Sequence, residues 1–418
     1  MSAIKNISAR EILDSRGNPT VEATVILSDE SIGISSCPSG ASTGTHEAVE
    51  LKDNDASRYN GKGVLQAVAN IENIIGPALM GKEASAQKEI DNILIALDGT
   101  PNKAKLGANA TLPVSMAVAK AQSLNEKVPL YRYIQKITNT NASLIPTPLF
   151  NILNGGKHAG ENIDFQEFIV IPNPQTAFSQ GLVQGAAVYS SLKGLLEQNQ
   201  LSTLVGDEGG FGPTLPNNEK ALSFIKQAIE KAGFETTKDI FMGLDAAASS
   251  FFKDGKYIIK EHPQGLTSQE LITLYKTLYE TYHFLYLEDV LHEDDWEGWV
   301  NMTDLFRSSN AIITGDDLLV TNPQRLQTAI QKRAVTGILI KPNQIGTVSE
   351  TLDVVLMAKQ ANIKTIVSHR SGETNDDFIA DFAVGVQADF VKFGAPARGE
   401  RIAKYNRLLK IESELQTT

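Results

Sequence analysis

The sequence predicts an α/β protein in which a smaller α+β domain precedes a closed barrel of β/α units. The main observation is that six short apolar runs in the second half each end in a polar residue able to bind a metal ion or move a proton. These residues are Asp245, Glu288, Asp316, Lys341, His369 and Lys392. Most neighbours in this series are roughly 25 positions apart, which is the length of one strand, one helix and two loops. Because the C-terminal ends of parallel barrel strands meet on one face, we expect these side chains to share one pocket.

The first part of the chain has the patterns of a small α+β domain. Residues 20–29 alternate between apolar and polar side chains, which predicts a half-buried antiparallel strand. A loop rich in glycine and serine follows at 35–45. Apolar-periodic stretches around 63–80, 84–97 and 107–125 predict helices. We therefore expect a capping domain over residues 1–135.

A polar segment with two prolines near its end predicts a linker at 136–147, and the barrel domain should occupy 148–418. The barrel should begin with strands at 148–156 and 165–172, followed by helices around 178–198 and 217–232. The strict alternation comes after them. Its helices carry ordinary signals, such as the capping box of Thr267 and Glu270 before the apolar stripe of 267–280. Such stripes indicate core packing.

Composition excludes several classes of protein. The chain has 418 residues, with 38 Lys and Arg against 49 Asp and Glu, for a net charge of −11. This acidic balance argues against nucleic acid as the main partner. Cys37 is the single cysteine, so no disulfide within the chain can form and a reducing compartment is expected. The charged N-terminus is unlike a secretory signal, and no apolar stretch has the roughly 18–20 residues needed to span a bilayer.

The strand-end residues themselves predict a metal-assisted proton transfer. Asp245, Glu288 and Asp316 offer hard oxygen ligands, which suit Mg²⁺ better than zinc or copper. A lysine beside a dication has a lowered pKa, so Lys341 can accept a proton as the neutral amine. Mg²⁺ and Lys392 can neutralise the carbanion that forms when a proton next to a carboxylate is removed.

The chain also resembles the enolase family along essentially its full length. The segments that carry the resemblance are 11–22, 38–51, 107–110, 151–160, 165–168, 206–211, 287–289, 293–296, 315–322, 340–347, 368–374 and 400–409. The resemblance implies an eight-stranded barrel of the order ββαα(βα)6. It also implies a carbon–oxygen lyase of glycolysis and gluconeogenesis that reversibly dehydrates 2-phospho-D-glycerate to phosphoenolpyruvate, with two Mg²⁺ per active site.

The resemblance implies a role for each matched residue. Asp245, Glu288 and Asp316 would bind the first Mg²⁺, and Ser42 would join the second. Lys341 would be the base and Glu208 the acid that protonates the leaving hydroxide, with a pKa raised by Glu167 beside it. The substrate would be bound by the remaining matched residues, which are His158, Gln166, Glu167, His369, Arg370, Ser371 and Lys392.

The family further implies a homodimer or an octamer in the cytoplasm, with a secondary cell-surface or secreted pool and secondary protein partners. The sequence departs from the family at Val290, Pro113, Ser250, Phe393 and Gly399. Phe393 adjoins Lys392, and a displacement of about 1 Å at a catalytic group can cost about a hundredfold in rate. Two alternatives therefore remain: a divergent paralogue with reduced activity and a non-catalytic binding role, and an acid–base enzyme of the same superfamily acting on another carboxylate.

Overall fold

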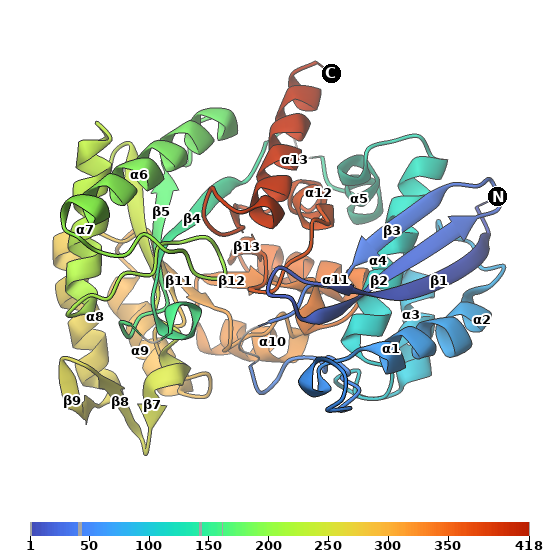
Figure 1. The fold of residues 1–418 in the computed structure, drawn as a ribbon, viewed down its shortest axis with the longest axis horizontal. Coiled ribbons are helices and arrows are strands. Elements are labelled where there is room, and N and C mark those ends of the chain that lie inside the picture. Colours follow the sequence, from blue (N-terminus) through green and yellow to red (C-terminus); the bar gives the residue numbers. More distant parts are fainter. Residues whose placement is uncertain (1, 41–43, 142–143, 161, 418) are drawn as a thin grey trace.

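A computed structural model describes residues 2–40, 44–141, 144–160 and 162–417. Figure 1 shows a barrel with its ring of helices on the left and a three-stranded sheet with its own helices on the right. Within the described ranges, no helix is long and apolar enough to cross a bilayer. The predicted α/β fold with an N-terminal capping part is confirmed.

The N-terminal sheet is an antiparallel meander of β1 (Ile4–Leu13), β2 (Pro19–Leu27) and β3 (Ile32–Ser36). The central strand β2 has the alternating burial that its sequence predicts, because one face packs on helix α4 (Ala108–Asn125). We did not predict β1, whose charged and polar residues lack a clear period. As an edge strand it has one hydrogen-bonding neighbour, and it therefore tolerates exposed polar side chains.

Four helical segments complete this part. Residues 65–79 form one continuous helical stretch, with α1 (Leu65–Asn70), a π-helical turn (Ile71–Ile75) and α2 (Gly76–Leu79). Helices α3 (Gln87–Asp98), α4 and α5 (Leu130–Thr138) follow, and α4 accommodates Pro113. Because α5 ends at Thr138 and the next strand begins at Thr147, the first residues of the predicted linker are helical. The division of the chain at 136–147 stays a prediction.

Eight strands close the barrel in the order ββαα(βα)6. The strands are β4 (Thr147–Asn154), β5 (Glu167–Pro172), β6 (Ile240–Asp245), β10 (Tyr286–Glu288), β11 (Ile312–Gly315), β12 (Gly337–Ile340), β13 (Lys364–Ser368) and β14 (Phe390–Lys392). The helices around them are α6 (Phe178–Gln198), α7 (Asn218–Lys231), α8 (Ser268–Tyr282), α9 (Trp296–Phe306), α10 (Pro323–Lys332), α11 (Val348–Gln360), α12 (Phe378–Gly385) and α13 (Gly399–Gln416). The predicted capping box of Thr267 and Glu270 begins α8.

The direction of β5 decides which of its residues reaches the functional end of the barrel. This strand runs antiparallel to both β4 and β6, whereas the other neighbouring pairs are parallel. Its first residue, Glu167, therefore lies beside the last residue of β6, Asp245. The other end of the barrel is filled by apolar side chains, among them Leu149, Tyr286 and Phe390. Polar groups are consequently gathered at one end.

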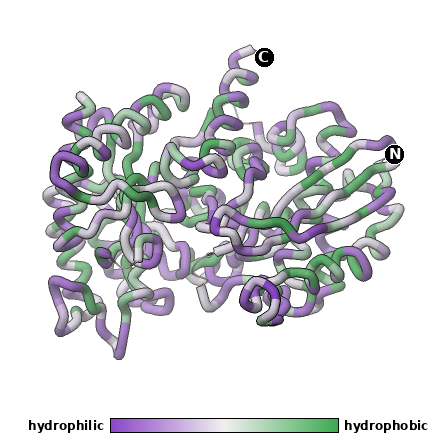
Figure 2. Tube along the Cα trace, in the orientation of Figure 1, coloured by the Kyte–Doolittle hydropathy of each residue, from purple (hydrophilic) through white to green (hydrophobic). Residues whose placement is uncertain are grey.

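A small sheet accounts for the long interval between Asp245 and Glu288. It consists of β7 (Phe252–Lys253), β8 (Lys256–Ile259) and β9 (His262–Leu266), and our sequence analysis did not predict it. Its outer turn is hydrophilic, as the purple tip below the barrel in Figure 2 shows. Short strands with many polar residues give a weak periodic signal.

We predict that Gly33→Ala destabilises the protein. A Cβ at Gly33 in β3 would lie 1.9 Å from the Ala117 carbonyl oxygen in α4, so the sheet and the helix would have to move apart. The expected loss is about 1–3 kcal/mol in the free energy of unfolding, measured by urea denaturation. Gly194→Ala in α6 is the matched control, because nothing lies near its added Cβ and a helical alanine should add about 0.5–1 kcal/mol. Equal midpoints for the two variants would contradict this packing.

Candidate active site

The predicted site residues converge on one pocket at the C-terminal end of the barrel. Its lining includes His158, Gln166, Glu167, Glu208, Asp245, Asp316, Lys341, His369, Arg370, Ser371 and Lys392. Glu288 does not line the pocket and lies fully buried beneath it. Ser42 lies outside the described residues. The barrel thus brings together side chains that are up to 234 positions apart, from 158 to 392.

Strand register places the three acidic residues at the same end of the barrel. Asp245 ends β6 and lies opposite Glu288, which ends β10. Glu288 in turn lies opposite Thr314 of β11, so Asp316 follows two residues later on the neighbouring strand. All three carboxylates are buried. The prediction that separate strand ends would bring these acids to one end of the barrel therefore agrees with the geometry.

The ammonium of Lys392 lies among three carboxylates. Its Nζ is 2.7 Å from Glu288 Oε2, 3.0 Å from Glu167 Oε2 and 3.2 Å from Asp245 Oδ2. Burial lowers the pKa of Lys392, but the surrounding carboxylates, Glu167 first, hold that pKa well above its usual value. Burial, followed by the negative charge of Asp245, raises the pKa of Glu288 to about 8. If all three acids were ionised, the cluster would carry more negative than positive charge.

This surplus fits a hard divalent cation. Oxygen atoms of Glu288, Asp289 and Asp316 lie within 4.8 Å of one another, and Glu288 Oε1 has no hydrogen-bond partner. Asp289 differs from the others because both of its oxygens accept backbone N–H groups, from Asp316 and Asp317, each at 2.9 Å. We therefore assign Asp289 to holding the Asp316 backbone in place. The expected third ligand, Asp245, is not in this group, and its Oδ2 lies 3.2 Å from Lys392 Nζ. Carboxylate oxygens of this kind suit Mg²⁺.

Lys341, at the end of β12, forms an ion pair with Asp316. Burial lowers the pKa of Lys341, but the Asp316 carboxylate outweighs burial and raises it above the usual value. Our sequence argument expected a lowered pKa because it placed a dication beside the lysine; with Asp316 as the direct partner, the ammonium form is favoured. The other Asp316 oxygen accepts a hydrogen bond from Gln344 Nε2 at 2.9 Å.

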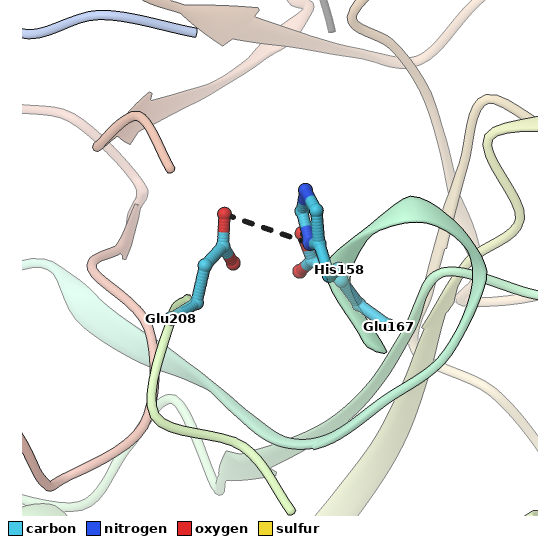
Figure 3. A group of neighbouring side chains, drawn as sticks. All are labelled: His158, Glu167 and Glu208. Carbon is cyan, nitrogen blue, oxygen red and sulfur yellow. Dashed lines mark ion pairs between the residues drawn. The ribbon is translucent and has the colours of Figure 1, made fainter. Parts of the chain in front are cut away.

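Glu167 also belongs to a second group of acidic residues, with Glu208. Figure 3 shows His158 and Glu167 facing Glu208, and His158 Nδ1 is 3.7 Å from an oxygen of each glutamate. Burial raises the pKa of Glu167 well above its usual value, and the negative charge of Glu208 adds to this effect. Burial also raises the pKa of Glu208, but His369 and His158 outweigh burial and hold it well below its usual value. The pKa is thus raised at Glu167 and lowered at Glu208, whereas our sequence argument placed the raised pKa at Glu208.

The tautomer of His369 follows from its neighbours. Arg401 Nη1, which can only donate, lies 2.8 Å from His369 Nδ1. Because burial lowers the pKa of His369 to about 4, the ring is neutral and its hydrogen lies on Nε2. Nε2 is 3.2 Å from Glu208 Oε2. His369 thus presents a positive dipole to Glu208, which favours the ionised carboxylate.

The loop after β13 supplies groups suited to an anion. The guanidinium of Arg370 and the hydroxyl of Ser371 both line the pocket, and Ser371 Oγ is 3.3 Å from His158 Nε2. Gln166 Nε2 donates to Asp245 Oδ2 at 3.4 Å and so connects the residue before β5 to the end of β6. A planar guanidinium beside a hydroxyl matches the geometry of a phosphate group.

Several polar residues of the pocket and its hydrogen-bond network were not predicted from the sequence, among them Glu47, Asp289, Asp317 and Gln344. Each of these lies inside a segment that carries the family resemblance. Their positions in these segments could have identified them as neighbours of the site. The departure at Phe393 does not reach the pocket. Its ring is buried against Tyr405, with centroids 5.9 Å apart, and Lys392 still reaches the three carboxylates.

Two family models match the chain. Residues 4–134 match the model described as enolase, N-terminal domain. Residues 142–418 match the model described as enolase, C-terminal TIM barrel domain. Together the two matches cover nearly the whole chain and include every described residue of the pocket.

We predict that Asp289→Asn weakens Mg²⁺ binding although Asp289 is not assigned as a ligand. An asparagine can accept only one of the two backbone N–H groups, and its own NH2 then opposes the other. Loss of such a supporting contact should lower metal affinity by roughly 10–100-fold, measured by calorimetric titration with MgCl2. Asp294→Asn is the control, because Asp294 is half exposed and pairs with Arg325 outside the pocket. Unchanged affinity in Asp289→Asn would contradict this assignment.

Proposed function

From the membership of this chain in the enolase family, we propose that it catalyses the reversible dehydration of 2-phospho-D-glycerate to phosphoenolpyruvate and water. Enolase domains indicate a lyase that binds a small-molecule substrate. The observation that best supports the finer proposal is that Lys341 pairs with Asp316 and Lys392 with Glu288 at the end of the barrel, where the pocket lined by both lysines also contains Glu208. Such a pocket can remove a carbon-bound proton at one side and protonate a leaving group at the other.

In the proposed reaction, the neutral amine of Lys341 takes the proton from C2, and the electron pair of the C–H bond moves into the substrate carboxylate. Mg²⁺, when bound, supplies positive charge for that carboxylate and for Asp316, the anion that otherwise favours the ammonium form of Lys341. Lys392, held by Glu167, Glu288 and Asp245, adds a fixed positive charge. The electrostatic stabilisation of the doubly charged carbanion is the largest contribution that we expect from the site.

Departure of the hydroxyl from C3 then needs a proton. We propose that the proton of the Glu167–Glu208 pair passes to Glu208 in the substrate complex and that Glu208 then gives it to the leaving oxygen, so that the C3–O bond breaks, water leaves and the C2–C3 double bond forms. In the unliganded pair the pKa is raised at Glu167 and lowered at Glu208, and the two carboxyl groups titrate as one coupled system. His158, between them, and Gln166 are proposed to bind the substrate, with Arg370 and Ser371 as the phosphate anchor.

The proposal includes two Mg²⁺ per site, the second with Ser42, as well as a homodimer or octamer in the cytoplasm. Exposed apolar residues on the N-terminal sheet, Leu13, Ile32 and Ile34, support an interface there. The single buried Cys37 supports a reducing compartment, because it offers no disulfide within the chain.

We predict that the protein forms phosphoenolpyruvate from 2-phosphoglycerate only with Mg²⁺, and that Lys341→Ala abolishes most of this activity. Loss of a positioned general base should lower kcat by about 10²–10⁴-fold. The measurement is the absorbance of phosphoenolpyruvate with MgCl2 and with excess chelator. Lys364→Ala is the matched control, because this lysine begins β13 at the opposite end of the barrel and pairs with Asp389.

Each contrary result points to a different alternative. Activity that survives the chelator would contradict the metal assignment. A folded protein that binds Mg²⁺ without turning over 2-phosphoglycerate would favour the non-catalytic paralogue. Turnover of an unphosphorylated hydroxy acid instead would favour another acid–base enzyme of the superfamily.

A further inference from the structure

We propose that Glu47 is a positioning residue that holds the Arg370 guanidinium in the orientation in which it binds a phosphate group. This inference rests on the proposed function, in which Arg370 anchors the substrate phosphate. Glu47 belongs to the N-terminal part of the chain, whereas Arg370 follows β13 of the barrel. The pair therefore joins two parts of the molecule at the pocket.

The contact has the geometry of a carboxylate–guanidinium fork. Glu47 Oε2 lies 2.8 Å from Arg370 Nη1, and Glu47 Oε1 lies 3.2 Å from Nη2. The side chains are only 5% and 3% exposed, so water screens the pair little. Asn343 Oδ1 accepts a further hydrogen bond from Nη1 at 3.1 Å. Because Glu47 and Asn343 accept hydrogen bonds from the two terminal nitrogens, the plane of the Arg370 guanidinium is fixed.

The carboxylate of Glu47 is itself fixed by its own loop. The Gly44 N–H donates to Glu47 Oε1 at 3.0 Å, and the Glu47 N–H donates to the Gly44 carbonyl at 3.1 Å. The next residue, Ala48, donates its N–H to the Gln344 carbonyl at 2.9 Å. Glu47 therefore needs little ordering when a ligand arrives, which is the condition for a preorganised binding group.

Glu47 also keeps Arg370 away from the metal carboxylate. Asp316 is a second anion whose charge acts on Arg370, and it is a proposed Mg²⁺ ligand. Gln344 separates the two anions, because its Nε2 donates to Asp316 at 2.9 Å and lies 3.4 Å from Glu47 Oε1. Without the Glu47 charge, the guanidinium would turn toward Asp316. It would then no longer present the edge that a phosphate needs.

A merely structural ion pair would show the same distances, so the test measures ligand affinity. Asp376 provides the matched control: its carboxylate, 9% exposed, pairs with Lys120 at 2.6 Å and joins the same two parts of the chain outside the active-site pocket. Asp376→Asn should lower thermal stability without changing anion affinity. Glu47→Gln, which keeps the shape and removes the charge, should change affinity.

The probe is inorganic phosphate, titrated into the full-length protein by calorimetry in the presence of chelator. We expect Glu47→Gln to weaken phosphate binding roughly ten- to hundredfold, because a small misplacement of a binding group has effects of this size. Arg370→Ala should weaken it as well. In the Arg370→Ala background, Glu47→Gln should have no further effect on phosphate affinity, because the two residues act as one unit. Circular dichroism and thermal unfolding would confirm that each variant is folded.

Phosphate affinity that is unchanged or stronger in folded Glu47→Gln would overturn the inference. An equal loss of phosphate affinity from Glu47→Gln in the parent protein and in the Arg370→Ala background would overturn it as well. A parent protein that binds no phosphate would also overturn it. The proposed function fails separately: if the parent and its variants show the expected phosphate affinities but 2-phosphoglycerate is not turned over, the role of Glu47 stands and the reaction does not.

Discussion

The buried contact of Lys392 with three carboxylates is the interaction on which the rest of the site depends. Charged groups are costly to bury unless opposite charges lie beside them, and here the acids outnumber the ammonium. Burial and the charge of Asp245 raise the pKa of Glu288 to about 8. An excess of carboxyl groups over ammonium groups is an environment that suits additional positive charge.

The barrel can contain these buried charges because its polar and apolar side chains lie in separate layers. The apolar layer that includes Leu149, Ile169 and Phe390 fills one end, so the strands are held together without contributions from the site. The reversed strand β5 then adds Glu167 from its first residue, where a parallel strand would have placed its last. The direction of this one strand thus places Glu167 beside Asp245 and within 3.0 Å of Lys392.

The N-terminal part completes the pocket and does more than cover it. Glu47 occupies the terminal nitrogens of Arg370. Gln344, on the barrel, connects this pair to Asp316. Arg370 and Asp316 consequently belong to one hydrogen-bonded network, in which a change of charge at one residue affects the other.

The sequence by itself determined the repeat of strands and helices and the polar residues at the strand ends, because both depend on local period and spacing. It also determined the family, because long ordered segments such as 38–51 and 340–347 are specific. Only the tertiary structure decided that burial raises the pKa of Glu167, that Asp289 supports the Asp316 backbone, and that Glu47 pairs with Arg370. These facts depend on burial and on contacts between residues distant along the chain, such as 47 and 370, and no local pattern encodes such distances.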